Sequence, residues 1–165
     1  MSKRFHGIEK IISGGQTGVD RGALDAAIDF GVSHGGSCPK GRLAEDGPIS
    51  PKYKLTELDS TDYAIRTKKN VMDSDGTLLL YQGRLRGGTA LTNRYAKELG
   101  KPLLRIRFDL PIKYSAVLLW LTENEIKTLN IAGPRKSGLP DAEQLTYQFL
   151  KKLFSQSASI LKTFD

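Results

Sequence analysis

Glycine-rich segments follow several short apolar runs in this chain, at points where a strand would give way to a helix. A glycine at such a junction lets backbone amides approach a ligand closely, and the first turn of the next helix adds unpaired N–H donors and partial positive charge. Phosphate is the natural ligand for that combination. Four junctions of this kind occur, at Gly14-Gly15-Gln16-Thr17-Gly18, Gly35-Gly36-Ser37, Gly87-Gly88-Thr89 and Gly133. They predict a site for a phosphorylated small molecule.

Basic residues stand beside the same glycine segments. Arg21 follows the first segment, Lys40 and Arg42 follow the second, and Arg135 follows the last. Because arginine guanidinium groups bind phosphate oxygens in pairs, we expect these residues to neutralise an anionic ligand. Arg84 and Lys136 are interpreted instead as ordinary surface charges, since most basic side chains lie at the surface.

The familiar nucleotide-binding motifs do not fit these segments. GGQTGVDRG lacks the GxGxxG spacing, and GRLRGGT has the glycine spacing of a P-loop but Thr89 where lysine must follow. Classical NAD binding and P-loop NTP hydrolysis are therefore disfavoured. Asp20, Glu45 and Asp46 are the acids that could serve an enzyme here as acid or base, although Asp20 is more simply expected as an acid in the first turn of a helix.

The sequence predicts no metal centre. The single cysteine, Cys38, and the two histidines, His6 and His34, cannot complete a closed tetrahedral zinc site. A lone cysteine is most often a small buried apolar residue, and we interpret Cys38 in that way, with a sulfur ligand to a soft metal as the alternative.

Strand-like and helix-like stretches alternate along the chain and would position these residues. We expect Ser60 or Thr61 to be the N-cap of a helix that runs to about residue 71. The segment 43–52 holds two prolines and is predicted to be an exposed loop. The pattern predicts an α/β, Rossmann-like fold with a mostly parallel sheet of about five or more strands and helices on both faces. Loops that follow parallel strands share one edge of the sheet, where ligands bind. The expected strands are 9–13, 32–37, 54–58, 77–81, 103–108 and 129–132, and the expected helices are 20–30, 60–71, 87–99, 115–129 and 141–155.

Composition narrows the class of partner. The 165 residues suit a single domain over 1–165, and the net charge of +7 favours anionic partners. Aromatic residues are 8% and form no stacking row, so single-stranded nucleic acid is the least favoured partner. No apolar run reaches the length of a membrane span and the N-terminus has no signal-peptide pattern, so we expect a cytoplasmic protein.

Five ordered motifs across about residues 11–137 resemble the molybdenum carrier family, the molybdenum cofactor carrier proteins: ISGGQTGVDRGALDAAI, CPKGRLAEDGPI, RTKKNVMDSDGTLLLY, RGGTALT and NIAGPRKS. The resemblance implies a Rossmann-like fold without dinucleotide binding, a homo-oligomer, and a pocket for molybdenum cofactor (molybdopterin), a pyranopterin phosphate. The cargo would be stored or delivered to molybdoenzymes. The cofactor-binding residues expected from these motifs and from the glycine-rich edge are Gly14, Gly15, Gln16, Thr17, Gly18, Arg21, Gly36, Lys40, Arg42, Arg66, Gly87, Gly88, Thr89, Thr92 and Arg135.

A more distant resemblance is to the cytokinin-activating phosphoribohydrolases. They share an arginine nine residues before a strand-opening aspartate, a spacing kept by Arg66 and Asp75, and a Gly-x-Gly-Thr-x-x-Glu helix start. Gly88-Thr89 keeps the phosphate-binding half of that helix start, but Thr92 replaces the glutamate. A hydroxyl cannot stabilise an oxocarbenium ion or activate water as a carboxylate does. We therefore expect a binding protein, with an enzyme that processes a nucleotide or nucleotide-sugar phosphate as the alternative.

Overall fold

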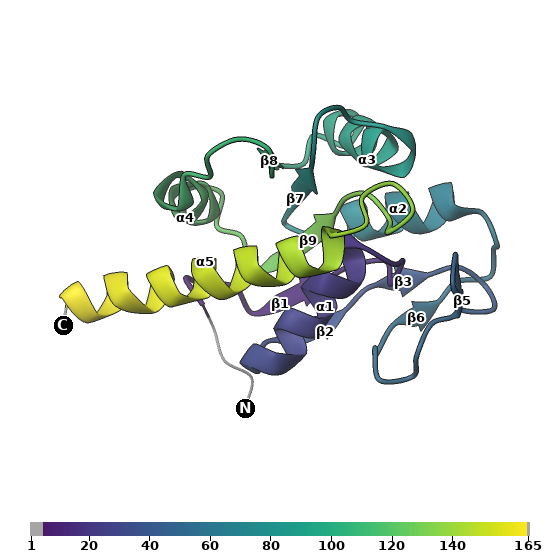
Figure 1. The fold of residues 1–165 in the computed structure, drawn as a ribbon, viewed down its shortest axis with the longest axis horizontal. Coiled ribbons are helices and arrows are strands. Elements are labelled where there is room, and N and C mark those ends of the chain that lie inside the picture. The colour runs from purple at the N-terminus through teal and green to yellow at the C-terminus, as the bar shows by residue number, and fades with distance from the viewer. Residues whose placement is uncertain (1–4, 165) are drawn as a thin grey trace.

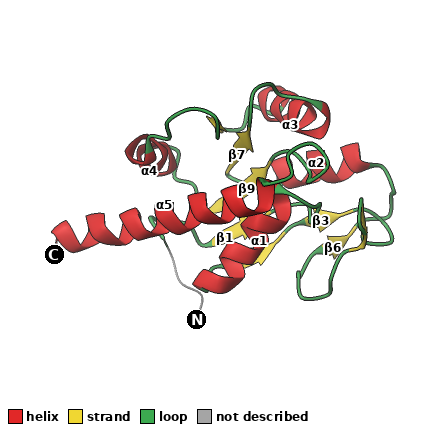
Figure 2. Ribbon diagram, viewed as in Figure 1, coloured by secondary structure: helices red, strands yellow, loops and turns green. Residues whose placement is uncertain are grey.

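A five-stranded parallel sheet in the order β2-β1-β9-β7-β8 forms the centre of the molecule (Figures 1 and 2). The computed structural model describes residues 5–164, with side chains described through residue 156. Two short sheets accompany the five-stranded sheet: a parallel pair of β3 with β6 and an antiparallel pair of β4 with β5. In chain order the elements are β1 (Lys10–Ile12), α1 (Val19–Phe30), β2 (Ser33–Gly35), β3 (Ser37–Cys38), β4 (Leu43–Ala44), β5 (Gly47–Pro48), β6 (Thr56–Glu57), α2 (Tyr63–Met72), β7 (Gly76–Tyr81), α3 (Gly87–Glu98), β8 (Leu103–Arg107), α4 (Tyr114–Glu123), β9 (Thr128–Ala132) and α5 (Ala142–Phe164).

Alternating side chains of the sheet divide the core between two helical layers. Leu78 and Leu80 of β7 pack in the main apolar core with residues of α1, α4 and α5. Leu79 is fully buried and, because strand side chains alternate, points to the opposite face, where α3 contacts β7 and packs against α2. Figure 1 shows α1 and α5 side by side and the α2–α3 pair apart from them. The predicted α/β, Rossmann-like class is confirmed.

Helix boundaries correct three predictions, one of which is the end of α5, predicted at about residue 155 and found at Phe164. The cap of α2 is Asp62, whose side chain accepts the N–H of Ala64 at 2.9 Å, so the prediction of Ser60 or Thr61 was wrong. The helix predicted to reach residue 129 ends at Glu123, because Glu125 adopts a left-handed φ of 49° and Thr128 already belongs to β9.

The segment predicted as an exposed loop at 43–52 contains the β4–β5 hairpin and part of a second apolar cluster. Ile49 and Tyr53 are buried there with Leu24 and Cys38. The guanidinium of Arg42 donates hydrogen bonds to backbone carbonyls of this segment, at 2.9 Å for both Ser50 and Tyr53. The prediction failed because the burial of this segment depends on tertiary contact with Leu24 of α1 and Cys38 of β3, which its own residues do not indicate.

The last strand of the chain, β9, inserts between β1 and β7 rather than extending an edge of the sheet. The loops that follow β1, β9 and β7 therefore lie next to one another at the carboxyl ends of the strands, where open α/β sheets bind ligands. Within residues 5–164, no helix combines the length and apolar character needed to cross a membrane.

Candidate functional site

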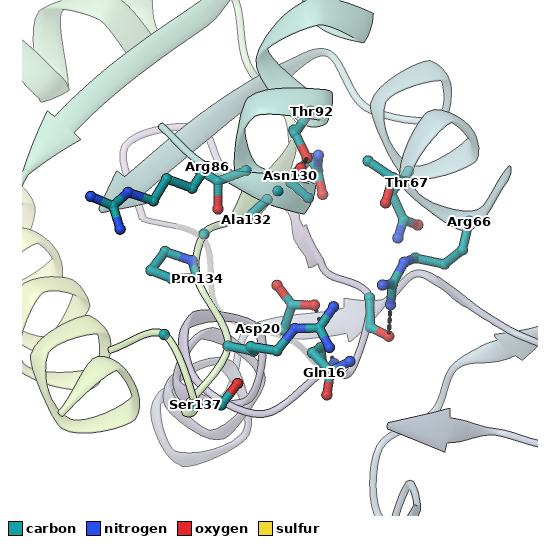
Figure 3. Close-up of a pocket in the computed structure, with 18 residues that line it drawn as sticks. Gln16, Asp20, Arg66, Thr67, Arg86, Thr92, Asn130, Ala132, Pro134 and Ser137 are labelled. Atoms are coloured by element: carbon teal, nitrogen blue, oxygen red, sulfur yellow. Dashed lines mark hydrogen bonds between the residues drawn. The ribbon is translucent and has the colours of Figure 1, made fainter. Parts of the chain in front are cut away.

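A cavity of about 480 Å³ opens at the carboxyl ends of the central strands (Figure 3). Its walls come from the loop after β1, from α2, from the start of α3 and from the loop after β9. Eight of the predicted binding residues line it, namely Gly14, Gln16, Arg66, Gly87, Gly88, Thr89, Thr92 and Arg135. The other lining residues are Asp20, Thr67, Asn70, Arg86, Asn130, Ala132, Gly133, Pro134, Ser137 and Gly138.

The N-terminus of α3 forms one wall and is open to the cavity. No side chain caps this helix end. A Cβ built on Gly87 or on Gly88 would meet no atom within 4 Å, so the backbone here is free of overlying atoms. An anion at this wall would meet unpaired N–H groups and the positive end of the helix dipole.

Arg66 from α2 brings a buried positive charge to the cavity. The residue is 8% exposed, and its Nη1 donates a hydrogen bond to the carbonyl oxygen of Gly14 at 2.7 Å. An added Cβ at Gly14 would lie 2.3 Å from that nitrogen, so a side chain there would displace the Arg66 guanidinium. In the described part of the chain, no carboxylate lies within ion-pair distance of Arg66. A buried guanidinium without a carboxylate partner favours an anionic ligand beside it.

Gln16 holds the loop after β1 and keeps one donor free. Its Oε1 accepts the backbone N–H of Thr17 at 3.0 Å and that of Glu45 at 2.9 Å. These two donors fix the orientation of the amide. Its Nε2 is buried and has no acceptor among the described residues.

Asp20 is the carboxylate of the cavity wall. It lies in the first turn of α1, as predicted, but it is only 7% exposed. Burial raises the pKa of its carboxyl group, and the charge of Arg66 and the N–H of Gln16, 3.2 Å from Oδ2, partly oppose that rise.

The remaining predicted residues lie outside the cavity lining, because their groups are used elsewhere in the protein. Arg21 forms a bidentate pair with Asp46, in which Nη2 lies 2.7 Å from Oδ1. Lys40 is exposed and lies 3.5 Å from Asp59. Arg42 binds carbonyls as described above. Three glycines allow close backbone contacts, since an added Cβ would meet Leu55 at Gly15, the Pro134 carbonyl at Gly18 and the Ser13 carbonyl at Gly36.

The acids of the β4–β5 hairpin fasten the cavity loops. Glu45 accepts hydrogen bonds from the Thr17 hydroxyl and from the Ser137 hydroxyl, the latter at 2.6 Å, and these bonds lower its pKa. The hydrogen bonds from Arg21 lower the pKa of Asp46 in the same way. Neither acid lines the cavity.

Sequence reasoning missed the polar side chains that enter the cavity from regular elements. Asn130 interrupts the apolar strand β9, and Asn70 lies buried on α2, where it binds the N–H and carbonyl of Ser37 at 2.7 and 3.1 Å. A polar residue inside an apolar strand was the available signal for Asn130. Cys38 is fully buried outside the lining, and burial raises the pKa of its thiol. Residues 5–156 hold no cluster of three or more His, Cys, Asp or Glu that could bind a metal ion.

Known proteins resemble this chain over most of its length. Residues 11–154 match the Circularly permutated YpsA SLOG family. A crystal structure at 1.45 Å of a protein named "Putative molybdenum carrier protein", from Syntrophus aciditrophicus SB, superposes with a TM-score of 0.85. The two sequences are 47% identical, and the match covers 90% of this chain and 96% of that one.

A shorter match is to the serine/threonine-protein kinase SSN3 of Phaeosphaeria nodorum, strain SN15. It is 40% identical over 60 residues, which are 36% of this chain and 14% of the kinase. This chain therefore corresponds to a small part of that relative's length.

The strand order agrees with a permuted chain. Counted from β7 instead of β1, the five central strands run β7, β8, β9, β1, β2, and their order in the sheet becomes 2-1-3-4-5. That is a common order of doubly wound folds, which bind ligands at the point between strands 1 and 3. Here this point lies between β7 and β9, and the loops after both strands line the cavity. By motif, by strand order and by sequence match, the chain belongs to the circularly permutated YpsA SLOG family.

Proposed function

We propose that this protein binds molybdenum cofactor, or a related pterin phosphate, in the cavity and carries it without transforming it. The observation that carries the proposal is the combination, in one cavity, of the open α3 N-terminus with the buried Arg66, which has no carboxylate within ion-pair distance among the described residues. The molybdenum carrier name of the 47% identical relative supports the choice of cargo.

The residues present fit a phosphorylated pterin. The volume of about 480 Å³ falls within the roughly 300–1,000 Å³ of small-ligand sites. The phosphate would bind the amides of Gly87 and Gly88, and Arg66 and Arg135 would balance its charge. The protein would hold its cargo through the phosphate and the pterin ring.

Holding the cargo is favoured over cutting it because of Thr92. The Thr92 hydroxyl donates a hydrogen bond to the Gly88 carbonyl at 2.9 Å, within the helix that would bind the phosphate. A neutral hydroxyl in this position supplies no carboxylate for hydrolysis. Storage or delivery to molybdoenzymes by a cytoplasmic homo-oligomer completes the proposal.

Analysis of the copurified ligand tests the proposal directly. Protein prepared without oxygen should release a pterin that is fluorescent after oxidation, together with molybdenum or tungsten, as measured by mass spectrometry and metal analysis. Titration with released cofactor should show binding and slower oxidation of the bound cofactor. Protein that copurifies with no pterin and does not protect added cofactor would contradict the carrier function.

Asp20 favours a second candidate, an enzyme acting on a nucleotide or nucleotide-sugar phosphate. A buried carboxyl group with a raised pKa inside a cavity is a suitable general acid. Incubation with a panel of nucleoside monophosphates should then release free base in the parent and none in Asp20→Asn. No release from any compound would exclude this candidate.

A further inference from the structure

Asp20 is an unexpected residue in a cavity suited to anions. It is the one carboxylate among the lining residues given above, which include Arg66, Arg86 and Arg135. A phosphate next to Asp20 would be repelled, since like charges about 4 Å apart are unfavourable even near a protein surface. The part of the ligand that reaches Asp20 must therefore carry N–H donors rather than negative charge.

The Asp20 carboxylate has acceptor capacity left for such donors. A carboxylate offers about four acceptor positions. Within residues 5–156, the N–H of Gln16 is the donor with hydrogen-bond geometry to it, at 3.2 Å, and Ser13 and Gly14 lie close enough to lower its pKa. It forms no ion pair within 4.0 Å there. The buried carboxylate thus gains from donors supplied by a ligand.

Asn130 and Gln16 add a second acceptor and a donor to the same cavity. Asn130 is 2% exposed, and its Nδ2 donates to the Thr77 hydroxyl at 3.2 Å, which leaves its amide oxygen without a partner in the described part of the chain. Gln16 contributes its unpaired Nε2. Figure 3 shows Asp20, Asn130 and Gln16 among the side chains around the cavity.

We propose that Asp20, Asn130 and Gln16 recognise the 2-amino-4-oxopyrimidine part of a ligand, the ring that pterins and guanine share. The amino group and the adjacent ring N–H would donate to Asp20 and Asn130, and the ring carbonyl would accept from Gln16 Nε2. Adenine offers a ring-nitrogen lone pair where this ring offers an N–H, and that lone pair would face the carboxylate. This inference rests on the proposed function, because it takes the phosphate to lie at α3.

Two pairs of probes test the recognition without knowledge of the natural cargo. Calorimetric titration compares GMP with AMP, and 6-hydroxymethylpterin with 6-hydroxymethyllumazine, in which a carbonyl replaces the 2-amino group. The parent should prefer the first member of each pair by about tenfold or more, because each rejected ring leaves buried acceptors unpaired. The relative affinities of GMP and the pterin then distinguish the two sources of the ring.

Two variants separate ring recognition from phosphate binding. Asp20→Asn keeps the shape of the side chain and should abolish both preferences, whereas Gly88→Asp should weaken GMP and AMP equally and leave their ratio unchanged. If Asp20→Asn does not fold by circular dichroism, Asn130→Leu should reduce the same preferences. Folded variants that keep the preference of the parent would overturn the inference.

Binding of the probes to the parent protein shows whether ring recognition alone fails or the proposed function fails as well. Equal binding of GMP and AMP that Gly88→Asp weakens would overturn ring recognition and leave the phosphate position standing. No binding of any of the four probes would count against both proposals.

Discussion

Replacement of Gly88 by aspartate tests the phosphate position because it adds charge where the fold has room for it. A Cβ at Gly88 meets no atom within 4 Å, and the residue is exposed. An aspartate in the first turn of a helix contributes about 0.3–1 kcal/mol of stability. The free energy of unfolding of Gly88→Asp should therefore equal or slightly exceed that of the parent.

The affinity for a phosphorylated ligand should fall in the same variant. Two like charges about 4 Å apart repel by about 1 kcal/mol in bulk water and about 4 kcal/mol at the effective dielectric of a protein surface. Because Gly88 is exposed, the penalty should lie between these limits. This range corresponds to a loss of affinity between roughly fivefold and a thousandfold.

Gly88→Asn is the matched control, since it has the shape of aspartate without the charge. Fluorescence titration of a pterin phosphate should show a much smaller loss for asparagine than for aspartate, and salt should narrow the difference. Equal losses in the two variants would attribute the effect to shape. Parent-like affinity in Gly88→Asp would show that the phosphate does not bind at α3.

Four further substitutions, and Gly47→Ala as a control, test contacts in the cavity and in the loops outside it. Arg66→Met should lower the free energy of unfolding, measured by urea denaturation, by about 1.5–3 kcal/mol, because it leaves the Gly14 carbonyl unpaired. It should also weaken phosphate binding. Parent-like stability and affinity would contradict the role of Arg66 in the cavity. Because burial raises the pKa of Asp20, the stability it contributes is full below its unfolded pKa of 3.8 and falls as pH rises through the raised pKa. In the parent this fall in the free energy of unfolding has a slope of up to about 1.4 kcal/mol per pH unit, and thermal melts at several pH values should show that Asp20→Asn removes it. The pKa of Glu45 is lowered, so the stability it contributes is present above pH 4.5 and is lost as pH falls through the lowered pKa. In the same thermal melts, Glu45→Gln should therefore lose less stability than the parent as the pH falls below 4.5. Gly36→Ala should lower stability by about 1–3 kcal/mol or more, since its φ is 125° and its Cβ would lie 2.1 Å from the Ser13 carbonyl oxygen. Gly47→Ala, with positive φ but open space, should cost less.

The glycine segments at 14–18 and 87–89 were the part of the cavity that sequence could predict. Each follows a strand, and parallel strands end at one edge of their sheet, so local pattern alone places these segments near one another. Arg66 was found through a motif spacing rather than through periodicity. All three features depend on information carried within a short stretch of chain.

Partners chosen by tertiary contacts could not be predicted. Arg21 and Arg42 stand beside glycine segments as Arg135 does, but their guanidinium groups bind Asp46 and the carbonyls of 49–55. Arg135 instead lines the cavity, with its Nη1 4.0 Å from Glu45. Nothing in their local sequence distinguishes them from Arg135, because the hairpin that supplies their partners folds back from another part of the chain. Asn130 gave a local signal as a polar residue in an apolar strand, but the five residues of β9 do not indicate the central position in the sheet that places it at the cavity.

The pairing of β9 with β1 brings together the two loops that an acid of the hairpin fastens. Loop 14–18 comes near the start of the chain and loop 133–138 near its end, and they become neighbours only when β9 pairs with both β1 and β7. Glu45 then joins them, because it accepts hydrogen bonds from Thr17 in the first loop and from Ser137 in the second. A carboxylate used in this way is held ionised by its donors, as its lowered pKa indicates, and is poorly suited to giving up a proton. Asp20, whose pKa moves in the opposite direction, is therefore the acid of this region that can respond to a ligand.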